Sequence, residues 1–276
     1  MNDTFSFGRF ASYFRFDLSR MWRNNTRTAI LLGAGSVLAV LFCGIGGLLF
    51  DFQWHTATDP FRFVTFAICL AVLELLMAKT YGFITDRKEG SDYLMIPAST
   101  FEKWLSMMLV CLVVIPVLFL VTYLLVDGFV CAVIPASGHP LYWWFGEGIE
   151  ASRTGFAELN ASMHARQIPL EYSLGSIVGP ALISACFNYL FFLLCGLLFK
   201  RHKILNAILV MMAVSSVFSL IAPHLLPDFA ARVEGMNEVQ AATFADGFFT
   251  VVTLVTGLLA ALLAAGCFYR IRKIAH

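Results

Sequence analysis

The sequence predicts an all-α, polytopic membrane protein with six transmembrane helices and an N-terminal interfacial amphipathic helix. Three observations lead to this fold class. The 276 residues are 59% hydrophobic and only 13% charged, which is more apolar surface than one soluble core can bury. Apolar runs long enough to cross about 30 Å of hydrocarbon recur along the chain. Lysine and arginine gather in alternate connecting segments.

The segment before the first span, residues 4–27, predicts a basic helix with two different faces. At about 100° per residue, Phe10, Phe14 and Met21 fall on one face, while Arg9 and Arg20 fall on the other. A helix of this kind lies among the lipid headgroups with its aromatic face toward the acyl chains. The alternative is a soluble helix that packs on a partner.

Six segments each supply the roughly 20 apolar residues that a span needs. We expect one membrane domain, 1–276, in which a cytoplasmic loop, 85–104, follows the second span and a large extracytoplasmic loop, 128–172, follows the third. The predicted spans are residues 28–50, 61–84, 105–126, 173–199, 204–222 and 247–269.

The distribution of positive charge predicts the orientation. Of the 19 lysines and arginines, fourteen lie on the side of the two termini, four lie on the other side, and Lys79 lies within the second span. Loops rich in Lys and Arg stay in the cytoplasm. We therefore expect both termini to be cytoplasmic.

Small residues recur at every fourth position in the first and last spans. Such stripes let helix backbones approach closely in lipid, where no hydrophobic effect drives helices together. They predict helix-packing seams, either within one chain or between two chains. The stripes are Gly35, Ala39, Cys43 and Gly47 in the first span, and Gly257, Ala261 and Ala265 in the last.

The sequence contains no recognisable catalytic or metal-binding motif. It lacks HExxH, GxSxG and the phosphate-binding GxxxxGK[ST] pattern. Its six histidines and seven cysteines do not have metal-ligand spacing. We therefore expect no enzymatic activity in this chain and no cofactor or metal, and the net charge of +1 gives no indication of a nucleic-acid partner.

The candidate intramembrane polar residues are Glu74, Lys79 and Asn188. Glu74 lies near the middle of the second span, where a charge costs about 2.5–3.5 kcal/mol on insertion scales. It either faces a polar conduit or forms a buried hydrogen bond with Asn188, Asn206 or a hydroxyl group. Lys79 lies nearer the cytoplasmic end and can extend its amine to the headgroups.

The cytoplasmic loop combines a run of charges with an apolar patch that ends at a proline. Ser99 and Glu102 then form the S-x-x-E capping box that starts the next helix. An apolar patch beside charges indicates a docking surface, and the alternative is a connector that lies on the membrane. The candidate partner-coupling residues are Asp86, Arg87, Lys88, Glu89, Tyr93, Leu94, Ile96 and Pro97.

These residues carry a family resemblance. A charged segment after the second span, then Leu-Met-Ile-Pro-Ala-Ser at 94–99 and Glu-Lys at 102–103, resembles permease subunits of the type-two ABC transporter family. Tyr-Phe-Arg-Phe-Asp-Leu at 13–18 resembles the N-terminal segment of compact permeases in Bacteroidetes-like bacteria. The resemblance implies an elbow helix at the membrane surface and a coupling helix at about residues 86–96.

The function that the resemblance implies is that of a permease subunit, an exporter in the bacterial inner membrane. It implies a separate ATP-binding-cassette ATPase subunit, docked on the coupling helix, and pairing with a second permease as a homodimer or heterodimer. Two alternatives stay open. One is a membrane scaffold or assembly factor that recruits a partner through 128–172, and the other is a proton-coupled carrier that uses Glu74.

Overall fold

A computed structural model of the chain describes residues 5–35, 37–38, 40–42, 54–85, 90, 93, 95–133, 139–234 and 236–275. These residues form helices and turns, with no strand among them. The elements are α1 (Phe7–Gly33), α3 (Trp54–Thr80), the 3₁₀ turn η1 (Gly82–Thr85), α5 (Thr100–Leu109), the π-helical turn η2 (Val110–Val114), α6 (Ile115–Val133), α7 (Leu141–Ala165), α8 (Leu174–Leu198), α9 (Lys203–Glu234) and α10 (Glu238–Ala275).

Four helices in the described part of the chain are long and apolar enough to cross a membrane, as a multi-pass membrane protein requires. They contain the second, third, fourth and sixth predicted spans. The first predicted span, 28–50, lies partly outside the described residues. The fifth falls in α9, of which Lys203–Val217 is the apolar section found among the described residues. The four helical ranges are Phe61–Thr85, Thr100–Val133, Leu174–Leu198 and Val239–Ile274.

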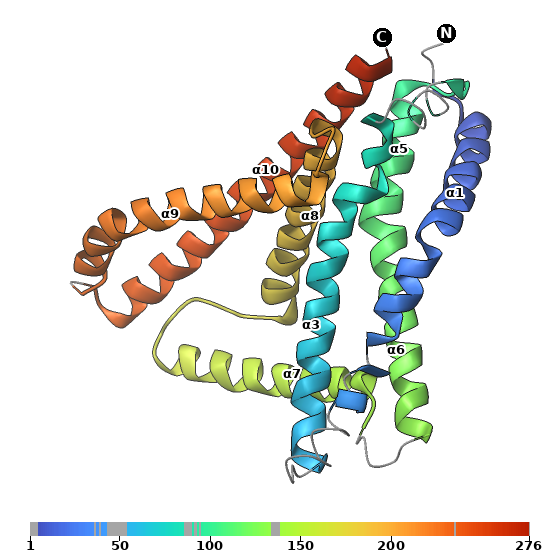
Figure 1. Ribbon diagram of the computed structural model, residues 1–276. Helices are drawn as coiled ribbons and strands as arrows, with labels where there is room; N and C mark the ends of the chain where they lie inside the picture. The colour runs from blue at the N-terminus through green and yellow to red at the C-terminus, as the bar shows by residue number, and fades with distance from the viewer. Residues whose placement is uncertain are drawn as a thin grey trace.

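The helices form an elongated bundle from which two helices project (Figure 1). α3 runs beside α8 and beside the continuous rod made by α5, η2 and α6, while α1 lies along that rod and α10 packs along α8. α7 and α9 extend away from the bundle on the same side. The first turn of α1, the start of α5 and the end of α10 lie at one end of the molecule.

α3 and α8 approach each other closely because Gly196 has no side chain. A Cβ atom at this position would collide with the backbone carbonyl of Ala78. Met77 and Ala78 are fully buried on the α3 side of the contact, and Leu197 on the α8 side. Small residues permit this kind of contact between helices in a membrane.

α1 differs from its prediction in two respects. It is one helix from Phe7 to Gly33, with no break between the expected surface helix, 4–27, and the expected first span. Its buried side consists of Phe10, Tyr13, Asp17 and Met21, whereas Phe7 and Trp22, which the same periodicity places toward the apolar face, are exposed. Contact with α5 and α6 decides which face is buried.

The third predicted span is a single rod interrupted by the π turn at Val110–Val114. Pro116 follows this turn after one residue, Ile115. In a regular α-helix its ring would press on the carbonyl of Leu112, and it has no N–H to bond that carbonyl. A wider turn before the proline accommodates the ring without breaking the rod.

Candidate functional site: the loop after α3 and its polar junction

The loop between α3 and α5 contains the predicted partner-coupling residues. Asp86, Arg87, Lys88, Glu89 and Leu94 lie outside the described residues. Of the remainder, the structure places Tyr93 in the core, with 1% of its surface exposed, and leaves Ile96 half-buried and Pro97 exposed. Among the described residues of the loop, Met95 is the most exposed apolar side chain, at 83%.

Tyr93 anchors the loop on the helices beneath it. Its ring stands edge-on to Phe83 at 5.8 Å between centroids and to Tyr13 of α1 at 6.5 Å. Its carbonyl accepts a hydrogen bond of 3.1 Å from Nζ of Lys103 in α5. The side chain therefore faces the protein, whereas Met95 is exposed.

A second lysine fastens the beginning of the loop. Lys203, the first residue of α9, donates from Nζ to the carbonyl of Gly82 at 2.6 Å. The methylene stem of Lys203 packs over Gly82 closely enough that a Cβ there would lie 2.8 Å from its Cδ. The loop is thus tied to α5 at one side and to α9 at the other.

Below the loop, a buried carboxylate joins three elements. Oδ2 of Asp17 in α1 accepts hydrogen bonds from the Tyr81 hydroxyl at 2.7 Å and from Oγ of Ser106 in α5 at 2.6 Å. All three side chains are buried. Burial raises the pKa of Asp17 above its ordinary value, and the two hydrogen bonds offset part of that rise.

The predicted capping box at the start of α5 is confirmed. Ser99 Oγ accepts from the Glu102 amide at 3.2 Å, and the Glu102 carboxylate accepts from the Ser99 amide at 2.9 Å. The same carboxylate accepts two bonds of 2.8 Å from the Arg9 guanidinium and one of 2.9 Å from the amide of Ser6. Glu102 therefore caps α5 and also fastens the first turn of α1 to it.

The intramembrane polar residues have different surroundings. Nδ2 of Asn188 donates to Oε1 of Glu74 at 3.4 Å, which is one of the hydrogen bonds expected for a buried carboxyl. Asn206 instead donates to the carbonyl of Arg201 at 3.0 Å. Lys79 is exposed. The hydrogen bond between Asn188 and Glu74, one of those expected from the sequence, thus links α3 to α8.

The predicted small-residue stripes of the first and last spans have different surroundings. Gly35 is buried, and a Cβ on it would lie 2.6 Å from Sγ of Cys69 in α3. On α10 the inner face is made by Ala260, Cys267 and Ile271. At two of its three positions, the predicted α10 stripe therefore does not pack against another helix in the described part of the chain. Gly257 is half-buried, Ala261 and Ala265 are exposed, and Ala39, Cys43 and Gly47 lie outside the described residues.

Sequence reasoning missed a buried ion pair at the far end of α3. Arg62 donates from Nε to Oδ1 of Asp127 at 2.9 Å and from Nη2 to Oδ2, and the two side chains are 1% and 0% exposed. Asp127 also accepts from the amide of Leu141 at 2.7 Å, and Arg62 donates to the carbonyl of His139 at 2.8 Å. In the sequence, Arg62 and Asp127 each lie at the extracytoplasmic end of a predicted span. Their opposite charges on the same side are the signal that could have indicated the pair.

The chemistry of this arrangement is the joining of helices by hydrogen bonds and ion pairs. Across the described residues, no three His, Cys, Asp or Glu side chains gather as a metal site. Comparisons with protein families, with curated proteins and with solved structures find no match to the chain. The loop after α3 carries one exposed apolar side chain, Met95, and is held by contacts with α1, α5 and α9.

Proposed function

We propose that the chain is the membrane-spanning permease subunit of an ATP-driven ABC exporter, and that a separate ATPase subunit docks on the loop after α3. The observation that carries the proposal is the combination of Met95, 83% exposed, with the fastening of the same loop to α1, α5 and α9. Apolar groups exposed beside charged residues are typical of a binding surface.

In this proposal, the contacts that hold the loop against α1, α5 and α9 transmit its motion to these helices. A partner that moves Met95 also moves Tyr93, whose carbonyl is bonded to Lys103 of α5 and whose ring packs on Tyr13 of α1. Packed interfaces respond by shifting whole elements, because their side chains do not deform continuously. Closure of the ATPase around ATP would then tilt these helices and change the side from which the substrate site is open.

In the proposed topology, six spans place both termini in the cytoplasm of a bacterial inner membrane. The spans at 28–50 and 204–222 complete the four that the described helices contain. A second permease, identical or homologous, supplies the other half of the transporter. The exposed small residues Ala261 and Ala265 on α10 favour that helix as the contact between the two.

A second candidate function is favoured by α7. This helix carries Tyr142, Trp143, Ile149 and Leu159 exposed, and aromatic anchors of this type are enriched at protein interfaces. A scaffold that recruits a partner would use this surface. The hydrogen bond from Asn188 gives Glu74 a structural role, and we do not extend the proposal to a proton-coupled carrier.

One purification experiment separates the two functions. The tagged chain is isolated from its native membranes in mild detergent, co-purifying proteins are identified by mass spectrometry, and ATP hydrolysis by the complex is measured. We expect an ATP-binding-cassette subunit that is lost in Met95→Asp and retained in Met95→Leu and Ile149→Asp. Loss of a non-ATPase partner in Ile149→Asp alone indicates the scaffold, and an ATPase retained by Met95→Asp contradicts the docking site.

A further inference from the structure

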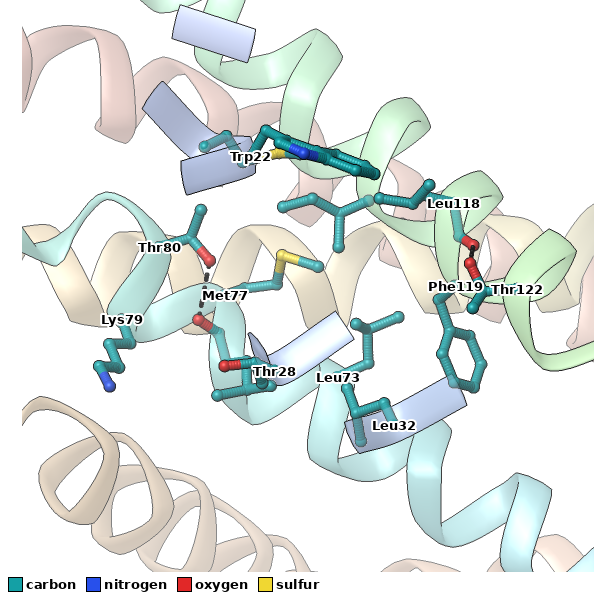
Figure 2. Close-up of a pocket in the computed structure, with 13 residues that line it drawn as sticks. Trp22, Thr28, Leu32, Leu73, Met77, Lys79, Thr80, Leu118, Phe119 and Thr122 are labelled. Atoms are coloured by element: carbon teal, nitrogen blue, oxygen red, sulfur yellow. Dashed lines mark hydrogen bonds between the residues drawn. The ribbon is translucent and has the colours of Figure 1, made fainter. Parts of the chain in front are cut away.

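A cavity of about 170 Å³ lies between α1, α3 and the rod formed by η2 and α6 (Figure 2). It is separate from the loop and from both polar clusters described above. Cavities of about this volume with apolar walls stay dry and bind small hydrocarbons. Its lining residues are predominantly apolar, and those that matter below are Trp22, Leu73, Lys79, Leu118, Phe119 and Thr122.

Two of the three threonines in the wall donate their hydroxyl hydrogens within their own helices. The Thr80 hydroxyl donates to the carbonyl of Leu76 at 3.0 Å, and the Thr122 hydroxyl donates to the carbonyl of Leu118 at 2.7 Å, as Figure 2 shows. Both donors are therefore satisfied within their own helices. A polar solute would lose its hydrogen bonds to water without replacement, whereas a hydrocarbon chain would not.

The two ends of the cavity differ in polarity. Leu73 and Phe119 are buried at one end, while Lys79 and Trp22 are exposed at the other. The ring of Trp22 lies over the lining residues, and the amine of Lys79 points away from them (Figure 2). Lysine and tryptophan in these positions are typical of the membrane–water boundary, where lipid phosphates lie.

We propose that this cavity binds one acyl chain of an anionic glycerophospholipid, whose phosphate pairs with Lys79. The chain lies against Leu73, Leu118 and Phe119, and the negative headgroup complements Lys79, the one positively charged side chain among the described lining residues. Because the cavity holds only part of a chain, the remainder lies along the exposed apolar surface of α3 and α6. The lipid would join α1, α3 and α6 in a way that does not depend on the proposed transport function.

The test uses the full chain purified from vesicles that contain equal amounts of phosphatidylglycerol and phosphatidylcholine, followed by native mass spectrometry. We expect one retained phosphatidylglycerol per chain. Lys79→Gln should lower the preference for the anionic lipid about fivefold, the effect of one cation near a lipid surface. Leu118→Trp, which fills the cavity, should remove the bound lipid. Leu209→Trp on the exposed face of α9 and Lys200→Gln in a turn are matched controls that retain it.

A second measurement needs no variant and covers the case in which Leu118→Trp does not fold. One equivalent of photoreactive phosphatidylglycerol is added to the detergent-purified chain, and labelled residues are mapped. We expect label on Leu73 and Leu118, displaced by unlabelled phosphatidylglycerol and not by phosphatidylcholine. Equal retention of both lipids, label spread over helices other than α1, α3 and α6, or a retained molecule that is not a phospholipid would each overturn the proposal.

Discussion

Replacement of Asp127 by asparagine should destabilise the protein strongly, because Arg62 would then be buried without a negative partner. Both oxygens of Asp127 accept hydrogen bonds, Oδ1 from Arg62 Nε, and Oδ2 from Arg62 Nη2 and from the Leu141 amide. An asparagine turns one of these acceptors into a donor, whichever way the amide is placed. Removing one partner of a buried ion pair costs about 3–5 kcal/mol, which corresponds to a melting temperature lower by about 6–10 °C for a chain of this size.

The buried cysteines provide the assay. Cys69, Cys111, Cys195 and Cys267 are free and buried, so a thiol-reactive dye reports their exposure as the detergent-purified protein is heated. Glu147→Gln on the exposed surface of α7 is the control and should change the unfolding free energy by no more than about 0.5 kcal/mol.

Adding Arg62→Met to Asp127→Asn distinguishes a lost charge pair from lost packing. The double variant has no unpaired buried cation, so it should recover part of the stability that Asp127→Asn loses. A loss of less than about 1 kcal/mol in Asp127→Asn, or a double variant weaker than the single one, would refute the electrostatic reasoning.

Two further predictions concern the packing of α8 and the buried acid of α1. Gly196→Ala should lower the unfolding free energy by about 1–3 kcal/mol, because the added methyl group collides with the Ala78 carbonyl of α3. Gly179→Ala is the control and should not lower it, because Gly179 has open space around it. Thermal unfolding followed with the thiol-reactive dye checks both variants. Burial raises the pKa of Asp17, so the folded state holds the proton more tightly, and stability falls as pH rises from the unfolded pKa through the folded pKa. Asp17→Asn retains an oxygen for both hydroxyl donors and should abolish that pH dependence, as measured by tryptophan fluorescence during thermal unfolding at several pH values; a persisting pH dependence would assign it to another group.

The sequence predicts best those features that depend on local chemistry. The capping box was predicted from Ser99 and Glu102 alone, because a cap involves only residues within one turn. Four of the six predicted spans coincide with long apolar helices, because span length follows from bilayer thickness.

The features that the sequence does not predict depend on contacts between residues that are distant along the chain. Asp17 bonds Tyr81 and Ser106, which lie 64 and 89 residues away. Helical periodicity places Asp17 on the same face as Phe10 and Met21, but it does not identify these distant partners. Arg62 was counted only as a charge outside the membrane, since its partner Asp127 is 65 residues away. The orientation of Tyr93 follows from the same kind of distant packing.

The two polar clusters together determine how α3 is held. At one end, Asp17 connects the Tyr81 hydroxyl, just after α3, to Ser106 of α5. At the other end, Arg62 of α3 is bonded to Asp127 of α6. Because α5, η2 and α6 form one rod, α3 is fastened to that rod at both of its ends. In the proposed mechanism, a push on the loop after α3 therefore displaces α1, α3 and the rod as one body, since bending α3 alone would break a buried hydrogen-bonded carboxylate at one end.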